Sequence, residues 1–419
     1  MSRLLSLLLL VVATLSSFAQ PVTLVTEISP RVAVVDPGAS ATFQASVANP
    51  GEFRATDLRV RFELAGDAAI ERIDSPNGWT CTMSGKSAEC ATPIVVIVAR
   101  RFDVTVRAGS TNGGATTLTM TASSAEPVAG QQYIARATLQ AYQTLAVETT
   151  ADAGPGSLRA AIETANALGH VSKIEFRLPA PVPAEGWFTI IPATPLPPIT
   201  ARRVYVDGKS QTRFTGDTNT RGPEIAIDGR LAHRGLEIHS PCLARVEGLT
   251  LGNFDANQGL WFTKSGECTD FSFESDVRLV ADNYIGTDPT GTVAWPNLRG
   301  LRGDFGSGTI RNNVISGNTY SGMWIWVSTD RYASYTIEGN KFGTAADGIA
   351  PLPNGAAGML LGDRVSADVR RNVIANHPGM GIALVRGDTY VRIQENSMRD
   401  NGGIGIDWGI DGTSSDTLD

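Results

Sequence analysis

Tryptophan and arginine side chains share one recurring position in the C-terminal part of this 419-residue sequence. The pattern is Gly-Φ-x-Φ, in which Φ is apolar, and its x position holds Trp261, Arg302 and Trp324, with Trp326 two residues further along. Because alternate side chains of a strand point to opposite faces, we expect x to face solvent while Φ faces the core. Exposed indole rings beside a guanidinium can stack on sugar rings and bind hydroxyls. These four residues are therefore the predicted glycan-binding strip, unless another domain or a second subunit covers them.

Aspartates follow the same pattern, at Asp304, Asp330, Asp363 and Asp388. Stacked on successive repeats, they could bind a cation such as calcium. Asp after Gly is also ordinary turn chemistry, because its side chain accepts hydrogen bonds from its own backbone. We prefer the turn interpretation, and we predict neither a metal site nor a cofactor. The integrin-binding tripeptide Arg-Gly-Asp at 302–304 and 386–388 falls in the same turns, where we expect it to be structural.

The histidines and cysteines do not suggest a metal site either. The four histidines are scattered along the chain, and His377 stands in a loop, where we expect a solvated side chain and not a general base. The four cysteines form two local pairs, Cys81 with Cys90 and Cys242 with Cys268. In an exported chain, this arrangement indicates two disulfides and not a zinc site.

A second repeated pattern, Φ-x-x-Asn-x-Φ, positions the candidate strip. Its asparagines recur every 24 to 32 residues, at Asn283, Asn313, Asn340, Asn372 and Asn396, and Leu249 occupies the same slot one repeat earlier. Each is followed by Gly-Φ-x-Φ, so two strands and a variable loop repeat. Such a unit cannot bury its apolar face alone, whereas coils stacked about 4.8 Å apart share a continuous core. The sequence thus predicts a parallel β-solenoid of about seven or eight coils, with the asparagines forming a hydrogen-bonded ladder at a tight bend.

Two further observations fit this frame. Cys242 and Cys268 lie 7 and 9 residues after Gly235 and Gly259, hence at similar positions on adjacent coils, where a disulfide is geometrically allowed. The string that begins at Gly286 recurs after 57 residues, at Gly343, so coils with long and short loops alternate.

Several strings resemble those of secreted bacterial right-handed parallel β-helix repeat proteins. They are Asn-Tyr-Ile-Gly-Thr-Asp-Pro-Thr-Gly-Thr at 283–292, Arg-Asn-Asn-Val-Ile-Ser-Gly-Asn at 311–318, and Gly-Ser-Leu-Arg-Ala-Ala-Ile at 156–162. The last resembles the segment that opens many such proteins. The resemblance covers 144–419 and implies a right-handed parallel β-helix.

The segment 157–168 is predicted to be a capping helix for this solenoid. Ser157 is a suitable N-cap, and Leu158, Ile162, Ala165 and Leu168 share one helical face. An amphipathic helix placed directly before a run of strands would cover the open N-terminal end of the core.

Residues 20–143 have a different pattern, that of a β-sandwich. Alternating strands are expected over 42–47, 58–64, 102–107, 116–121 and 133–140, with turn signals such as Asn112-Gly113-Gly114 between them. This region resembles bacterial immunoglobulin-like domains, including the Trp79-Thr80-Cys81 hairpin closed by Cys90. The predicted fold class is therefore all-β, with an Ig-like β-sandwich followed by the β-helix.

The first nineteen residues and the overall charge indicate where the protein works. A basic residue, an apolar run and a small-residue end over 1–19 are typical of a secretory signal peptide, so we expect a secreted or extracellular protein, with the periplasm as an alternative. The sequence has no apolar stretch of the ~20 residues that a membrane helix needs. The net charge of −7 argues against nucleic acid as a partner.

Catalysis is not predicted. Glycosidases need two carboxylates about 5 to 9.5 Å apart, and of the motifs typical of polygalacturonases only Asn-x-Asp is present, at 253–255. We therefore predict a secreted or cell-surface-associated adhesion-type protein that binds polysaccharide through the β-helix flank. A polysaccharide lyase or glycoside hydrolase of the β-helix type is the alternative.

Overall fold

The computed structural model describes residues 21–93, 98–128, 133–168, 171–240, 242, 244–263, 278–304, 306–327, 332–385 and 389–409. The described chain forms two compact units. The first contains residues before 32 together with 40–107 and 116–139, and the second contains 32–39, 108–115 and the chain from 140 onwards. The predicted signal peptide lies outside the described residues.

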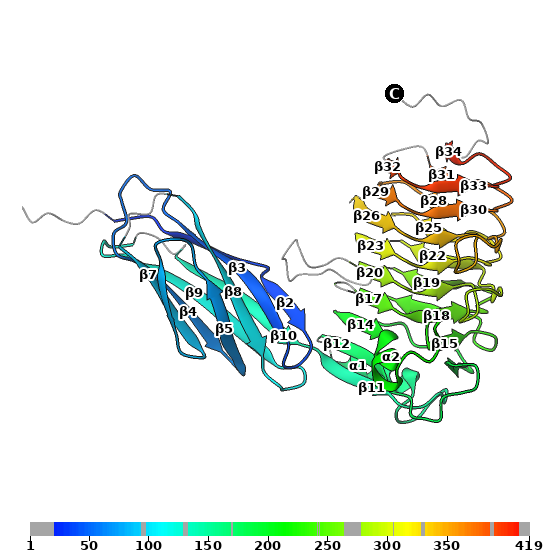
Figure 1. Ribbon diagram of the computed structural model, residues 1–419, viewed down its shortest axis with the longest axis horizontal. Coiled ribbons are helices and arrows are strands. Elements are labelled where there is room, and N and C mark those ends of the chain that lie inside the picture. Colours follow the sequence, from blue (N-terminus) through cyan, green and yellow to red (C-terminus); the bar gives the residue numbers. More distant parts are fainter. Residues whose placement is uncertain are drawn as a thin grey trace, which may run out of the picture. The chain divides into compact units, whose positions relative to one another are not determined.

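The strands of the first unit, together with β2, form an antiparallel β-sandwich, and Figure 1 shows these strands in blue and cyan. The sheet orders are β1-β3-β8-β5 and β2-β10-β9-β4-β7-β6. The strands are β1 (Val25–Ser29), β2 (Val32–Val35), β3 (Ser40–Ala48), β4 (Leu58–Ala65), β5 (Ala68–Asp74), β6 (Thr80–Met83), β7 (Ser87–Thr92), β8 (Arg100–Ala108), β9 (Ala115–Ser123) and β10 (Ile134–Ala141).

Strict alternation of apolar and polar residues produces these strands. In β4 every second residue is buried, as expected for a strand with one face on the core. Phe102 packs edge-on against Phe62 and Trp79, with ring centroids 5.8 Å and 5.0 Å away. The predicted Cys81–Cys90 disulfide is present and joins β6 to β7.

The second unit is a solenoid with three parallel sheets, and the strands of each sheet stack coil upon coil along the axis, as the labels in Figure 1 show. The nine-stranded sheet contains β11 (Gln143–Val147), β12 (Ser172–Phe176), β14 (Val204–Asp207), β17 (Ala244–Glu247), β20 (Arg278–Ala281), β23 (Gly308–Arg311), β26 (Ala333–Glu338), β29 (Val365–Arg370) and β32 (Tyr390–Gln394). The eight-stranded sheet contains β13 (Phe188–Ile190), β15 (Ile225–Asp228), β18 (Leu249–Gly252), β21 (Tyr284–Ile285), β24 (Val314–Ile315), β27 (Lys341–Phe342), β30 (Val373–Ala375) and β33 (Ser397–Arg399). The seven-stranded sheet contains β16 (Leu236–Ile238), β19 (Gln258–Phe262), β22 (Arg299–Gly303), β25 (Met323–Ile325), β28 (Met359–Leu361), β31 (Ile382–Leu384) and β34 (Ile406–Trp408).

Each full coil therefore has three strands, which corrects the prediction of two. The Φ-x-x-Asn-x-Φ pattern is not a single strand, because the residue before each asparagine has a positive φ, as at Asp282 (57°) and Asn312 (56°). The left-handed conformation turns the chain sharply, so the pattern spans the corner between the nine-stranded and eight-stranded sheets. Short strands on both sides of such a corner look continuous in the sequence.

The predicted asparagine ladder occupies this corner. Asn283, Asn313, Asn340 and Asn372 each donate a side-chain hydrogen bond to the Oδ1 atom of the asparagine one coil further on, at 2.9 to 3.1 Å. The second amide hydrogen of each goes to a backbone carbonyl, such as that of Val280. Since these side chains are almost fully buried, the ladder satisfies polar groups that would otherwise be costly to bury.

A second ladder, not predicted, lies at the corner between the eight-stranded and seven-stranded sheets. It consists of Asn297, Asn318, Asn354, His377 and Asn401. The expectation that His377 is solvated is wrong, since the side chain is buried and only 1% exposed. Asparagines one coil away on either side bind it because the loop returns to the core at this point.

The solenoid core consists of stacked apolar side chains. Val246, Val280, Ile310 and Ile337 are in register on successive strands and nearly fully buried. The helix α1 (Leu158–Leu168) packs against β11 and β12. Its N-cap is Ser157, whose Oγ accepts a hydrogen bond from the backbone N–H of Ala160 at 3.2 Å. A second helix, α2 (Lys209–Thr215), follows β14.

Candidate functional site

The predicted strip lies on the outer face of the seven-stranded sheet. Trp261 of β19 pairs in register with Arg302 of β22, and Arg302 pairs with Trp324 of β25. The apolar neighbours Leu260, Leu301 and Met323 are buried, whereas the three strip residues are partly exposed. Two strand spacings separate the two tryptophans, about 10 Å along the solenoid axis.

Arg302 connects the two indoles. Its guanidinium carbon lies 4.9 Å from the centroid of the Trp261 ring and 5.4 Å from that of Trp324. Its Nε donates to Oδ1 of Asp304 at 2.6 Å, and the Trp261 indole N–H donates to Oδ2 of the same carboxylate at 2.7 Å. Cation–π contacts and charge-assisted hydrogen bonds thus fix both side chains before any ligand arrives.

Two residues that the sequence analysis missed, Arg299 and Tyr320, lie beside the Trp324 end of the strip. Arg299 lies 4.5 Å from the Trp324 ring centroid and 5.2 Å from that of Tyr320. Burial lowers the pKa of Arg299, with Arg302 adding to the effect. Trp326 stands edge-on to Trp324 with centroids 6.5 Å apart. Trp326 and Tyr320 are the most exposed aromatic rings here, at 39% and 54%. Tyr320 could be found in the sequence only by its place in the loop before β25.

The strip has limits along the column. His239 packs edge-on against Trp261 at 6.0 Å and lies 3.3 Å from Glu237. Glu237, Ala383 and Asp407, which the pattern also turns outward, are buried. Among the described residues of this column, the partly exposed aromatic rings are therefore those on β19 and β25, with Arg302 of β22 between them.

The Asn-x-Asp string at 253–255 forms local structural contacts. Asn253 donates to the buried Asp228, Phe254 lies in the core, and Asp255 pairs with His233 at 2.7 Å. His233 and Asp255 are both more than half exposed. The three positions therefore point in different directions and do not form a shared site.

Asp304 serves the strip and is not free to bind a cation or to be recognised in an Arg-Gly-Asp loop. Both of its carboxylate oxygens are occupied by Arg302 and Trp261, and Gly303 is buried in β22. Asp330, Asp388 and the second tripeptide at 386–388 lie outside the described residues. Within the described ranges, no group of three or more histidine, cysteine or acidic side chains could hold a metal ion. Cys242 is disulfide-bonded, and its predicted partner Cys268 lies outside the described residues.

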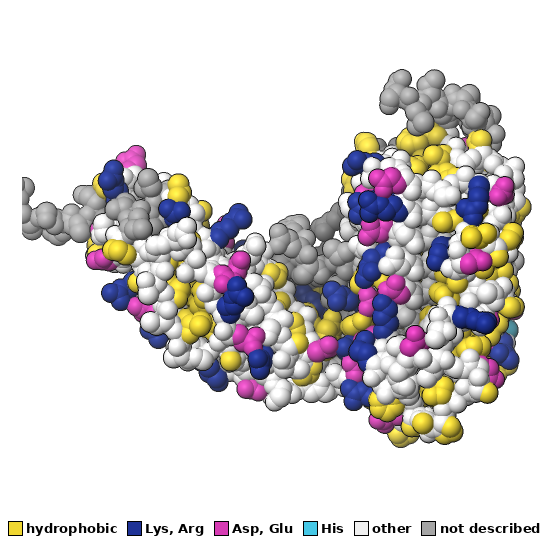
Figure 2. Space-filling model, in the orientation of Figure 1, with side chains coloured by type: hydrophobic (Ala, Val, Ile, Leu, Met, Phe, Trp, Pro, Cys, Tyr) yellow, Lys and Arg dark blue, Asp and Glu magenta, His cyan; other side chains and the backbone are white. Residues whose placement is uncertain are grey.

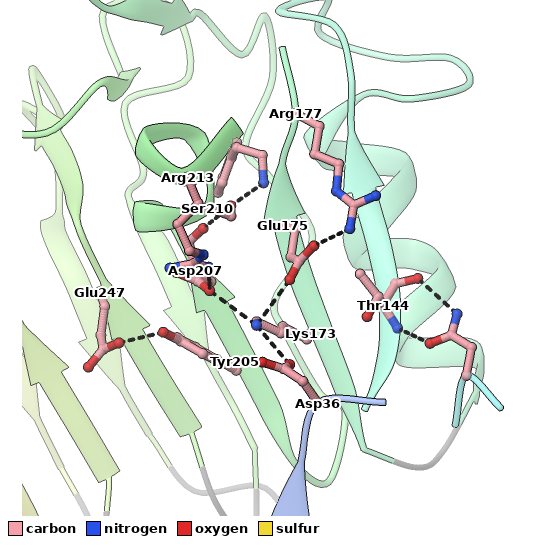
Figure 3. Close-up of polar contacts among 12 residues, drawn as sticks. Asp36, Thr144, Lys173, Glu175, Arg177, Tyr205, Asp207, Ser210, Arg213 and Glu247 are labelled. Atoms are coloured by element: carbon pink, nitrogen blue, oxygen red, sulfur yellow. Dashed lines mark hydrogen bonds and ion pairs between the residues drawn. The ribbon is translucent and has the colours of Figure 1, made fainter. Parts of the chain in front are cut away.

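An ion network, also missed by the sequence analysis, lies on the outer face of the nine-stranded sheet (Figure 3). Lys173 of β12 is almost fully buried and lies 2.8 Å from Asp36, 3.0 Å from Glu175 and 3.3 Å from Asp207. Beside it, the Tyr205 hydroxyl donates to Glu247, and burial raises the pKa of Tyr205. Each of these carboxylates is paired with a cation or accepts a hydrogen bond from a hydroxyl. The network therefore holds the segment 32–39 against β12 and presents no reactive group.

The face of the β-helix unit seen in Figure 2 carries charged, polar and hydrophobic side chains. Figure 2 shows basic and acidic side chains lying next to one another on the β-helix unit. Several are paired on adjacent strands, such as Arg370 with Glu338 at 2.8 Å and with Asp368 at 3.2 Å. Partly exposed pairs of this kind contribute little to stability.

Comparison with known proteins supports the architecture. Residues 299–417 match the family model described as "Right handed beta helix region". The solenoid is a right-handed parallel β-helix. No curated protein shows a significant match to the chain. Among the described residues, no helix has both the length and the apolar character needed to cross a bilayer.

Some solved structures share a distant likeness with part of the chain. The sixth cohesin of scaffoldin B from Acetivibrio cellulolyticus, in complex with a Cel5 dockerin mutant, is 9% identical with a TM-score of 0.23, covering 29% of this chain and 99% of its own. The CARDB domain of PF1109 from Pyrococcus furiosus, in complex with di-metal ions, is 17% identical with a TM-score of 0.19, covering 29% and 93%. A type III cohesin module of ScaE from Ruminococcus flavefaciens is 13% identical with a TM-score of 0.21, covering 29% and 88%. Likeness at this level says nothing about the function of this chain.

Proposed function

We propose that this chain is an exported adhesion-type protein that binds polysaccharide along the β-helix strip. The observation that carries the proposal is the in-register row Trp261–Arg302–Trp324, continued by Trp326 and flanked by Tyr320. Partly exposed aromatic rings with guanidinium groups between them offer apolar faces to sugar rings and donors to their hydroxyls.

Preorganisation supports this role. Asp304 holds both Trp261 and Arg302, so their side chains have little freedom to lose when a ligand binds. Each rotamer-rich side chain that is already fixed avoids a cost of about 0.5–1.5 kcal/mol. The length of the strip, about 10 Å between the outer tryptophans, is close to that of a disaccharide. An extended glycan could therefore contact both ends.

Export is the second part of the proposal. The Cys81–Cys90 disulfide is a feature of oxidising compartments, and the pattern of residues 1–19 is that of a secretory signal. Replacing the apolar run with charged residues should keep the protein inside an expressing bacterial cell. Unchanged export of such a variant would contradict this part.

Glycan binding is tested by retention on insoluble cellulose, chitin and xylan. The double variant Trp324→Ala/Trp326→Ala should lose most retention on the polysaccharide that binds the native protein, while its thermal unfolding changes little. The matched control is Tyr332→Ala/Tyr390→Ala, which removes an exposed aromatic pair with centroids 6.0 Å apart away from the strip. Equal binding by the strip variant and the native protein, or equal loss in the control, would overturn the proposal.

A further inference from the structure

A polar groove on the eight-stranded sheet is separate from the aromatic strip. Its volume is about 600 Å³, within the usual range for small-ligand sites. One wall is α2 and the segment that follows it, and the floor is formed by Tyr284, Val314 and Lys341, which are in register on β21, β24 and β27. The position of α2 creates the groove, because this helix stands beside the coils of the solenoid.

The segment that follows α2 and forms the wall of the groove is held in place by specific contacts. The Asn219 amide donates to the carbonyls of Pro223 and Pro289, both at 2.9 Å. The Tyr284 hydroxyl donates to the carbonyl of Arg221 at 2.5 Å. A Cβ atom on Gly222 would lie only 2.4 Å from the Tyr284 ring, so glycine allows the loop to pack against the coil. The groove therefore exists before a ligand binds.

Some of the charged side chains that line the groove form ion pairs, and others do not. Its lining contains four cations, Lys209, Arg213, Arg221 and Lys341, and three carboxylates, Asp217, Glu224 and Asp282. Lys209 is paired with Asp282, and Arg213 is paired with Asp207 outside the groove. Within the described part of the chain, the side chains of Arg221 and Lys341 make no ion pair, although the charge of Lys341 helps to lower the pKa of Asp347.

The two remaining cations line different parts of the groove, Arg221 the wall and Lys341 the floor. The backbone carbonyl of Arg221 accepts a hydrogen bond from the Tyr284 hydroxyl, and Lys341 lies two strands further along the column that begins at Tyr284. The separation of Tyr284 and Lys341 along the axis is about 10 Å. Burial raises the pKa of Glu224, so this carboxylate loses its charge more readily than a free one. Exposed Thr220 and Asn312 in the lining offer hydroxyl and amide groups.

We infer that this groove binds an acidic oligosaccharide, with Arg221 and Lys341 each contacting a carboxylate or sulfate group. Two groove cations that make no ion pair among the described residues, on a chain of net charge −7, favour an anionic ligand. The neutral donors and acceptors between them match the hydroxyls of a sugar chain. This site goes beyond the proposed function of the aromatic strip and does not depend on it.

The test is calorimetric titration of the full mature chain with three hexasaccharides of equal length, one carrying carboxylates, one carrying sulfates and one uncharged. At least one acidic hexasaccharide should bind, more weakly at high salt, and the uncharged one should not. Arg221→Gln/Lys341→Gln should weaken binding on the order of tenfold or more, since two charge contacts are lost. Arg392→Gln is the matched control, because Arg392 is an exposed cation on the nine-stranded sheet.

Other outcomes separate the alternatives. Trp324→Ala/Trp326→Ala should leave this binding unchanged, which distinguishes the groove from the strip. Failure of both acidic hexasaccharides to bind, equal weakening by Arg392→Gln, or equally tight binding of polyglutamate would overturn the inference. Thermal unfolding of each single variant, Arg221→Gln and Lys341→Gln, verifies that the fold is intact.

Discussion

His377 takes the place of an asparagine in the second ladder, and its Nδ1 accepts a hydrogen bond from the backbone N–H of Asn354 at 3.3 Å. Its own backbone N–H donates to Oδ1 of Asn401 at 3.1 Å. Acceptance at Nδ1 requires that this atom carry no proton, so the ladder holds the neutral imidazole. The histidine is thus a structural residue whose charge state is coupled to folding.

The first prediction concerns pH. Burial lowers the pKa of His377 from 6.5 to about 4. Between these values the unfolded chain binds a proton that the folded chain does not, so the free energy of unfolding falls as pH falls from 6.5 to 4. The contribution lost is roughly 3 kcal/mol at most. His377→Asn should remove this part of the acid sensitivity, because an amide does not titrate. Denaturant unfolding of both proteins at pH 7 and pH 4.5 measures the difference. An identical pH dependence would show that His377 is not responsible.

The repeats made the fold class predictable because β-helix coils impose equivalent neighbours on residues at equivalent positions. Asn283 and Asn313 recur since each must bind the next, and Gly-Φ-x-Φ recurs since each Φ meets the same core. The corner at Asp282 hid the third strand, because a change in φ at one residue leaves no mark on apolar spacing. The helix α2 was missed because its seven residues show no apolar period.

The candidate sites were less predictable than the fold. The spacing of the Gly-Φ-x-Φ pattern predicted that Trp261 and Trp324 share a column with Arg302 between them. The strand register of the structure has this arrangement. The bridging by Asp304 depends on side-chain rotamers, which sequence spacing does not determine. The place of His377 in a buried ladder was not predicted because the members of this ladder are separated by 21, 36, 23 and 24 residues, so variable loop lengths obscure their common position.

The asparagine ladder should be most sensitive at its centre. Asn340→Ala removes the side-chain donor to Asn372 and to the Ile310 carbonyl, and the acceptor for Asn313. Because these partners stay buried without replacements, we expect a loss of roughly 3–5 kcal/mol in unfolding free energy. Asn396→Ala, at the partly exposed end of the ladder, should cost only about 1 kcal/mol. Equilibrium denaturation gives both values, and equal losses would contradict a cooperative ladder.

The Cys81–Cys90 disulfide should stabilise the sandwich alone. It closes a loop with a sequence separation of 9, for which loop-closure entropy predicts about 2.5 kcal/mol. Cys81→Ser/Cys90→Ser should therefore lower the midpoint of the sandwich transition in calorimetry by several degrees. Reducing agent should produce the same shift in the native protein and none in the variant. A shift of the β-helix transition by the same amount would mean that the two units unfold together.

The last prediction concerns Asp304, because replacing this residue disturbs the positions of the strip side chains without removing any of them. Asp304→Ala leaves every aromatic ring in place but frees the guanidinium of Arg302 and the indole of Trp261. Two side chains must then be ordered by the ligand, at about 0.5–1.5 kcal/mol each. Glycan retention should accordingly weaken by about tenfold. The midpoint of thermal unfolding should change little. Asp363→Ala is the control, since Asp363 follows β28 and its Oδ1 accepts a hydrogen bond from the neighbouring backbone N–H of Arg364. Restored binding in Asp304→Glu would support positioning by a carboxylate. Native-like retention in Asp304→Ala would mean that Trp324, Trp326 and Tyr320 bind the glycan without the bridged half of the strip.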